Sequence, residues 1–361
     1  MKLATLSSEI TIFEKVSLVD KLAFTKHLSL MLKSGITLSE AISILEKQTT
    51  RTVFRKLLSR IHQEIANGQP FHKALSKFPH VFDAFYVNLI RVAEESGTLE
   101  KNLDYLAIHL KKQHEFTNKV RGALLYPSIV LGVALVTGLG LSIFVLPKLI
   151  DLFASLDVEL PLSTKILLFV AAVMRDYGIY ILAALITLFV LLRFAISTRF
   201  FKPHWHYFIV SLPIFGIFVQ KIELAAIFRN LGMMLSVGVP ISLGLSTQYE
   251  TTGNYVYKEY LAKIRNGVQR GQSIEEILSK ESEKFIPLIA VRMIGVGEKT
   301  GKLDETFAYL GDYFEDEVDD ASKNLATVLE PAILIIVGLV VAFIAVAIIG
   351  PIYQFTGSIK R

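Results

Sequence analysis

Hydrophobic residues recur at helical spacing in the parts of this chain that also carry charges. Leu28, Met31 and Leu32 form an i, i+3, i+4 apolar stripe, which is typical of a helix with one buried face. Gly35 follows as the expected left-handed end of that helix. The pattern predicts an all-α fold in which the polar parts of the chain form helical bundles.

Three apolar segments are long enough to cross a bilayer, which takes about 20 residues. The first and the last contain no charged residue, from Arg121 to Lys148 and from Glu330 to Lys360. The middle one, residues 177–196, carries a single charge close to its end. The sequence therefore predicts an integral membrane protein with three transmembrane helices.

The basic residues beside these segments predict the orientation, because Lys and Arg gather on the cytoplasmic side of membrane helices. Lys111, Lys112, Lys119 and Arg121 precede the first segment, and only Lys148 follows it closely. The flanks of the second segment agree with this orientation, and those of the third do not. We expect a cytoplasmic N-terminus and, after an odd number of spans, an extracytoplasmic C-terminus.

The chain also matches itself at a shift of about 204 residues, which indicates an internal duplication. The matches run from the first polar region through the apolar segment that follows it, and a one-residue insertion separates two registers. At a shift of 203 the matching pairs include Ala23 and Ala226, Leu28 and Leu231, Gly35 and Gly238, and Gly68 and Gly271; at 204 they include Glu94 and Glu298, Gly97 and Gly301, Pro127 and Pro331, and Pro147 and Pro351.

Each copy is expected to form a cytoplasmic helical domain followed by a transmembrane helix, and the second span returns the chain to the cytoplasm. Residues 166–174 are too short to span a bilayer and are expected to lie at its surface. The predicted boundaries are an N-terminal segment at 1–22, the first cytoplasmic domain at 23–122, transmembrane helices at 123–149, 176–196 and 327–351, an extracytoplasmic linker at 150–175, the second cytoplasmic domain at 197–326 and an extracytoplasmic tail at 352–361.

The duplicated regions carry paired motifs: LMLKSGITL with MMLSVGVPI, VAEESGTLEKNL with VGEKTGKLDETF, and LYP with LEP. Together with VLPKL after the first span, these motifs resemble those of the type II secretion F family over nearly the whole chain. The resemblance implies an inner-membrane platform protein of a type IV pilus or a type II secretion machine. The implied partners are a cytoplasmic hexameric ATPase, pilin or pseudopilin subunits, other inner-membrane components and further copies of the chain. The motifs do not distinguish a pilus from a competence or a secretion system.

Composition excludes several other classes. The chain is 52% hydrophobic and contains no cysteine, and its net charge of +5 lies mostly beside the membrane segments. We therefore expect no thiolate site, no bound nucleic acid, no cofactor and, without a phosphate-binding loop or a Ser/His/Asp arrangement, no enzyme. His204 and His206 flank Trp205 at a membrane boundary, where an interfacial anchor is favoured over a metal site. A transporter or channel subunit is the alternative, but such proteins keep ionisable residues inside their spans.

Two equivalent turns are candidate contact surfaces. Glu94 precedes Gly97, and Glu298 precedes Gly301, each by three residues. The simpler interpretation is that each glycine ends a helix in the left-handed conformation. A glutamate in the last turn opposes the helix dipole, which indicates that each carboxylate has a partner.

A second candidate interface lies on the last helix of each soluble domain. The repeat aligns Lys111 with Glu315 and Lys112 with Asp316, and Asp319 lies on the same acidic face. One domain is therefore basic where its copy is acidic. We expect these faces to meet, within one chain or between protomers, although a solvated face or a docking site for the ATPase would give the same pattern.

Small residues form stripes in the first and third spans. They lie at Ala134, Gly138 and Ser142, and at Gly338 and Ala342. Such stripes allow membrane helices to approach closely, so we expect helix packing there. The prolines that bound these spans, Pro127 with Pro147 and Pro331 with Pro351, are interpreted as first-turn and terminating prolines.

Overall fold

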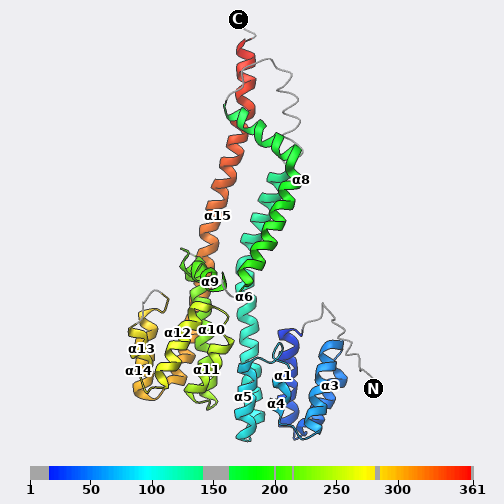
Figure 1. Ribbon diagram of the computed structural model, residues 1–361, viewed down its shortest axis with the longest axis vertical. Coiled ribbons are helices and arrows are strands. Elements are labelled where there is room, and N and C mark those ends of the chain that lie inside the picture. Colours follow the sequence, from blue (N-terminus) through cyan, green and yellow to red (C-terminus); the bar gives the residue numbers. More distant parts are fainter. Residues whose placement is uncertain (1–15, 141–161, 199–200, 214, 281–284, 359–361) are drawn as a thin grey trace, which may run out of the picture. The chain divides into compact units, whose positions relative to one another are not determined.

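The computed structural model describes residues 16–140, 162–198, 201–213, 215–280 and 285–358, and within these ranges the chain forms helices and no strand (Figure 1). The predicted all-α fold is therefore confirmed for the described residues. The chain divides into two compact units. Unit 1 combines residues 1–118 with 220–316, and unit 2 combines residues 119–219 with 317–361.

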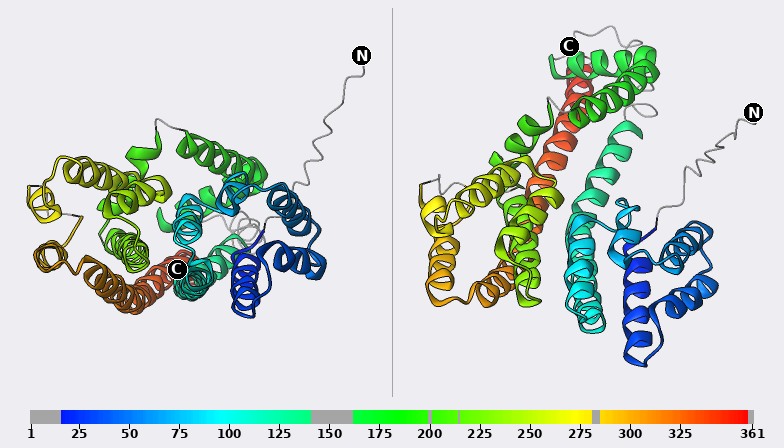
Figure 2. Two further views of the ribbon diagram at one scale, coloured as in Figure 1. Left: turned by 90° about the horizontal axis from the view of Figure 1, so that it is seen from below. Right: turned by 60° about the horizontal axis from the view of Figure 1, so that its bottom comes forward.

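Unit 1 contains the polar parts of both sequence repeats, and the two repeats have the same order of helices. Figure 2 shows the short helices of each repeat gathered beside the start of its long helix. The first repeat consists of α1 (Leu18–Lys33), α2 (Leu38–Gln48), α3 (Thr52–Ala66), α4 (Phe71–Ser76), α5 (Ala84–Glu95) and the long helix α6 (Leu99–Gly140). The second consists of α10 (Phe215–Ser236), α11 (Ile241–Thr251), α12 (Tyr255–Val268), α13 (Ile274–Ser279), α14 (Leu288–Thr300) and the long helix α15 (Leu303–Ser358).

Glycines end the equivalent helices of the two repeats in the same way. Gly97 and Gly301 have φ angles of 67° and 71°, so the prediction of left-handed helix ends is confirmed at both. The same conformation recurs at the other glycine pairs of the repeat, Gly35 with Gly238 and Gly68 with Gly271. Because a residue with a Cβ rarely adopts this conformation, the glycines fix where the helices stop.

Each repeat buries its own apolar core. Tyr86 lies at the centre of the first, where its hydroxyl and that of Thr25 are 2.9 Å apart. Tyr257 is buried in the second, and its hydroxyl donates to the carbonyl of Phe285 over 3.1 Å. Both hydroxyls thus find a partner inside an apolar core, as buried tyrosines require.

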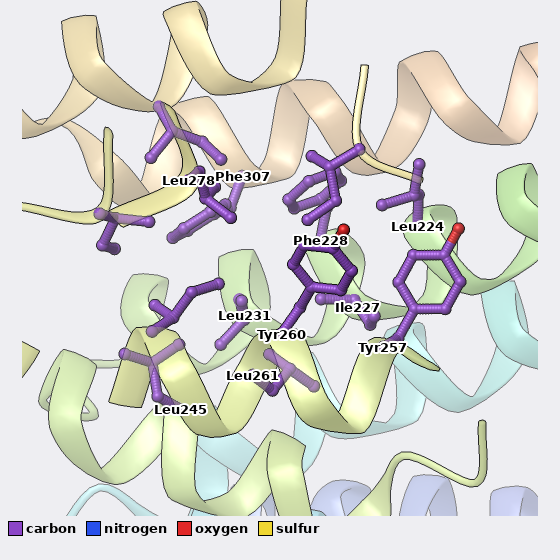
Figure 3. Close-up of a pocket in the computed structure, with 14 residues that line it drawn as sticks. Leu224, Ile227, Phe228, Leu231, Leu245, Tyr257, Tyr260, Leu261, Leu278 and Phe307 are labelled. Carbon is purple, nitrogen blue, oxygen red and sulfur yellow. The ribbon is translucent and has the colours of Figure 1, made fainter. Parts of the chain in front are cut away.

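The second core also encloses a small apolar cavity of about 30 Å³. Figure 3 shows Phe228, Leu261 and Phe307 among the side chains around it. The exposed lining of the cavity is apolar and would offer a water molecule no hydrogen bond.

Unit 2 contains α8 (Leu162–Ser197), α9 (Phe201–Ser211) and the later parts of α6 and α15. Since α8 begins at Leu162, the residues predicted to be a surface segment, 166–174, are part of one continuous helix. The sequence predicted a segment separate from the apolar segment at 177–196, whereas the two belong to the same helix.

Among the described residues, one helical stretch is long and apolar enough to cross a membrane, Asp176–Phe194 within α8. The pair α9 and α10 also passes this test but is bent by 109°. Because α10 supplies Leu224, Phe228 and Leu231 to the core of the second repeat, burial in that core accounts for its apolar character. Part of the first predicted span, 123–149, lies outside the described residues.

The prolines differ from the sequence prediction. Pro127 lies inside α6, and Pro331 and Pro351 lie inside α15, so none of the three begins or ends its helix. Pro147 lies outside the described residues. The rule assumes that an interior proline, which lacks a backbone N–H and crowds the preceding turn, ends a helix; here the helices continue through all three prolines.

Candidate functional site

The Glu94 carboxylate belongs to the first repeat's own architecture. It accepts hydrogen bonds from the backbone N–H groups of Phe71 and His72, over 2.7 and 3.2 Å, at the start of α4. The His72 ring nitrogen Nδ1 lies 2.6 Å from the same carboxylate. Burial would raise the pKa of Glu94, but these hydrogen bonds outweigh it and lower the pKa.

Glu298 does the same in the second repeat. Its carboxylate accepts from the backbone N–H groups of Ile274 and Glu275, over 2.7 and 3.1 Å, at the start of α13. Both glutamates therefore satisfy the exposed donors of a helix N-terminus. The expected partner of each glutamate exists, and it lies inside the repeat rather than on another surface.

The predicted charged faces come together in a different register. Lys112 Nζ lies 3.2 Å from Asp312 Oδ1, and not opposite Asp316. Lys111 pairs along its own helix with Glu115, at 3.7 Å. Asp316 is exposed.

Glu315 and Asp319 have other partners. Arg229 NH1 lies 3.1 Å from Glu315 Oε2, and both side chains are largely buried. Lys119 Nζ lies 3.0 Å from Asp319 Oδ2 in unit 2. Basic residues of α6 thus pair with acidic residues of α15 that lie 200 positions later in the sequence. The aligned repeat predicted partners 204 positions later.

The small-residue stripes contribute no close contact among the residues whose side chains are described. Gly338 and Ala342 are exposed, and no heavy atom lies within 4 Å of the position of a Cβ on Gly338. The side chains of Ala134 and Gly138 and the whole of Ser142 lie outside the description. Close packing of these stripes remains a prediction.

The contact between the two repeats is the part of unit 1 that both copies build together. Helix α5 packs against α11, and the Asn88 amide donates to Thr247 Oγ1 over 2.8 Å. The Arg229 guanidinium lies 4.8 Å from the ring centre of Phe116, across the same contact. A cation over an aromatic face adds attraction where water is excluded.

A polar cavity of about 210 Å³ lies within this contact. It is much larger than the apolar cavity of the second core, and titratable groups of both signs line it. From the first repeat come Lys21, Asp83 and His109, and from the second come Glu223, Asn230 and Gln248. Sequence reasoning missed this site because its residues lie on five helices and two loops, and no motif spacing connects them.

The surroundings of the cavity shift the pKa of a base, His109, and of an acid, Glu223. Burial, followed by the positive charges of Arg229, Lys21 and Lys112, lowers the pKa of His109 to about 3. The ring is 5% exposed and stacks on Phe85, with 4.7 Å between ring centres. His109 is therefore held as the neutral form.

The acid in the cavity is held in its neutral form over a wider pH range than usual. Burial raises the pKa of Glu223, opposed by a hydrogen bond from Asn254. Among the described residues, no group of three or more His, Cys, Asp or Glu is placed to hold a metal ion. The arrangement suits proton-dependent contact between the repeats.

Acidification from pH 7 to pH 5 is expected to lower the free energy of unfolding by about 2 kcal/mol through His109. Its folded pKa is depressed, so the stability it contributes is present above the unfolded pKa of about 6.5 and is lost as pH falls toward 3. Glu223 acts in the opposite direction, because its raised pKa favours the protonated folded form. Denaturation of the wild type and of His109→Gln at both pH values measures the difference.

The His109→Gln variant should lose most of this pH dependence. His80→Gln, at an exposed position of the same repeat, is the matched control and should keep it. An unchanged pH dependence in His109→Gln would show that the ring is not the group that takes up the proton.

Comparison with known proteins identifies the repeated architecture. The sequence model of the family described as type II secretion system (T2SS), protein F, matches the chain twice, at residues 24–147 and 227–351. The type IV pilus assembly protein PilC of Thermus thermophilus is 32% identical over 343 residues, which cover 95% of this chain and 84% of that protein.

Two further relatives are a type IV pilus assembly protein and a type II secretion system protein. The type IV pilus assembly protein PilC of Pseudomonas aeruginosa is 31% identical, with 94% of this chain and 91% of that protein covered. The type II secretion system protein F of Vibrio cholerae is 25% identical, with 96% and 85% covered. The similarity therefore extends over both repeats and the segments between them.

Proposed function

Because this chain belongs to the type II secretion system protein F family, we propose that it is the inner-membrane platform of a machine that assembles pilin-like subunits. The observation that carries the proposal is the double match of the family to the two repeats, over most of the chain. The named pilus proteins are more similar to it than the named secretion protein, at 32% and 31% against 25% identity. A type IV pilus machine is therefore favoured over a secretion machine.

In this role the chain couples ATP hydrolysis by a cytoplasmic hexameric ATPase to the insertion or extraction of pilin or pseudopilin subunits, and it catalyses no reaction itself. Three spans hold it in the membrane, with the N-terminus and both soluble repeats in the cytoplasm. The continuous helices α6 and α15 support this arrangement, because each connects one soluble repeat to a predicted span without a loop. Such helices transmit a displacement more directly than a flexible linker does.

Membrane vesicles of the two orientations test the proposal. In inside-out vesicles the cytoplasmic face is accessible, and we expect the chain to bind the purified assembly ATPase of its own machine and to change its rate of ATP hydrolysis. Right-side-out vesicles should have no effect, and the chain without the ATPase should hydrolyse no ATP. An effect in right-side-out vesicles would contradict the orientation, and no effect in either would contradict the coupling.

A further inference from the structure

Helix α9 has an exposed aromatic face, formed by Phe201, Trp205 and Phe208. These side chains are 54%, 38% and 53% exposed, and the ring centres of Trp205 and Phe208 lie 5.8 Å apart. Their i, i+4, i+7 spacing places them within about 60° of one another around the helix. The opposite side of α9 carries Val210, which is 1% exposed. Helix α9 therefore buries one side in the protein and leaves a row of large rings uncovered on the other.

This aromatic face begins where α8 ends. The candidate span within α8 ends at Phe194, and α8 itself ends at Ser197, which is about 5 Å further along the helix axis. The backbone N–H of Lys202 donates to the carbonyl of Thr198 over 3.1 Å, so α9 starts beside the end of α8. The headgroup layer on each side of a bilayer is about 5–8 Å thick. With α8 across the membrane, the start of α9 lies at the level of the headgroups.

A tight turn separates α9 from the helix that follows it. Helices α9 and α10 are bent by 109° relative to each other. The backbone N–H of Gly216 donates to the carbonyl of Leu212 over 2.9 Å, and a Cβ on Gly216 would clash with the backbone carbonyl of Val210. The chain thus leaves α9 sharply before α10 enters the second repeat. A helix held nearly perpendicular to the one that enters a soluble domain can lie along a membrane surface.

The sequence around α9 carries charges of one sign. No Asp or Glu occurs between residues 177 and 222, whereas this range contains four Lys or Arg residues: Arg193, Arg199, Lys202 and Lys221. Lys202 lies about 100° around the helix from the centre of the aromatic face, at its edge. A lysine at such an edge can keep its stem among apolar groups and its amine among headgroups. Basic residues beside a membrane are attracted to anionic lipids.

We propose that α9 is an interfacial helix, which lies in the membrane surface beside the end of α8 and binds anionic phospholipid there. The aromatic face inserts about 5–10 Å into the boundary between headgroups and acyl chains, and Lys202 meets the phosphate groups. A lipid surface fits better than a protein partner, because the face follows a candidate span directly, aromatic residues are enriched at membrane interfaces and the neighbouring charge is only positive.

This contact holds the start of α10, and with it the entry to the second repeat, at the membrane surface. The proposal rests on α8 crossing the membrane, and it does not depend on the identity of the machine.

Tryptophan fluorescence tests the proposal, because Trp205 is the only tryptophan of the chain. The full-length protein is reconstituted into vesicles of phosphatidylcholine and phosphatidylglycerol, with or without bromine on the acyl chains close to the glycerol. Bromine quenches tryptophan on contact. We expect the brominated lipid to remove most of the Trp205 emission and aqueous acrylamide to remove little of it. Quenching by acrylamide alone would overturn the proposal, and so would protection from both quenchers, which would indicate that protein covers the ring.

Two control variants, both built on Trp205→Phe, separate insertion of α9 from mere closeness to the bilayer. Leu185→Trp lies inside the candidate span and should be quenched by brominated lipid. Tyr207→Trp lies on α9 but about 160° around the helix from Trp205, and it should be quenched much less than Trp205.

The controls also separate failure of the proposal from failure of the membrane placement. Without quenching of Leu185→Trp, α8 does not cross the membrane, and both ideas fail. Quenching of Leu185→Trp without quenching of Trp205 would overturn the role of α9 alone. Equal quenching of Trp205 and of Tyr207→Trp would show that the aromatic face does not insert.

The lipid charge tests the role of Lys202. Quenching of Trp205 should be weaker in vesicles of brominated phosphatidylcholine alone than in vesicles that also contain phosphatidylglycerol, and Lys202→Gln should reduce this difference. Lys165→Gln is the matched control, because it removes the same charge from an exposed position of α8 before the candidate span, and it should leave the difference unchanged. Equal quenching of the wild type in both lipids, or equal effects of the two variants, would contradict binding of anionic phospholipid beside α9.

Discussion

Replacing Gly232 by alanine is expected to lower the free energy of unfolding by about 3 kcal/mol, at the upper range for overpacking. Gly232 lies on α10 where that helix crosses α15. A Cβ there would lie 2.7 Å from the backbone nitrogen of Ala308 and 3.0 Å from its Cα. Backbone atoms cannot rotate away as a side chain can, so the two helices would have to separate. The gain of about 1 kcal/mol in helix propensity does not offset this cost.

Gly244→Ala provides the matched control, because this glycine lies inside α11 of the same repeat. A Cβ there would meet the Leu231 side chain at 3.7 Å, an ordinary contact. We expect this change to stabilise the chain by about 0.5–1 kcal/mol. Chemical denaturation in mild detergent, followed by circular dichroism, compares the two variants. Equal effects would mean that α10 and α15 are free to separate at Gly232.

The first repeat does not use glycine at the equivalent positions. Ser29 corresponds to Gly232, and Ala107 corresponds to Gly311, whose Cβ would lie 2.9 Å from the Arg229 backbone nitrogen. The Ser29 hydroxyl donates to the carbonyl of Glu100 over 3.3 Å. The crossing is therefore close enough in the second repeat to exclude a side chain, whereas the first accommodates one.

The duplication and the helix ends could be predicted from sequence because they depend on local chemistry. Gly97 and Gly301 adopt the left-handed conformation that their positions after apolar helices indicated. The partner of Glu94 depends on how α4 packs near the end of α5, and no local pattern contains that information. The sequence therefore predicted that a partner exists but not that it is the start of α4.

The charged contact shows where alignment of repeats stops being informative. The alignment pairs Lys112 with Asp316 as equivalent positions, but equivalent positions touch only across a symmetric contact. In the structure Lys112 meets Asp312, one helical turn before Asp316. The polar cavity around His109 was missed for the same reason, since it forms only when unlike faces of the two repeats combine.

Replacing Glu94 by alanine is expected to lower the free energy of unfolding by about 3 kcal/mol, because two backbone donors lose a charged acceptor worth about 1.5–3 kcal/mol per bond. The donors are the N–H groups of Phe71 and His72, 2.7 and 3.2 Å from the carboxylate. The Glu94 side chain is 28% exposed, so water only partly replaces it. Glu298→Ala should have a similar effect on the second repeat, through Ile274 and Glu275.

Glu95→Ala is the matched control, because its side chain is 61% exposed and pairs along its own helix with Arg91, at 3.5 Å. This change should alter the free energy of unfolding by less than about 0.5 kcal/mol. The sign of the pH dependence gives a second readout. The depressed pKa of Glu94 means that its contribution is present above the ordinary value of 4.5 and is lost as pH falls through the folded pKa. Glu94→Ala should therefore unfold with a weaker acid dependence than the wild type, and an effect no larger than that of Glu95→Ala would show that α4 does not need this carboxylate.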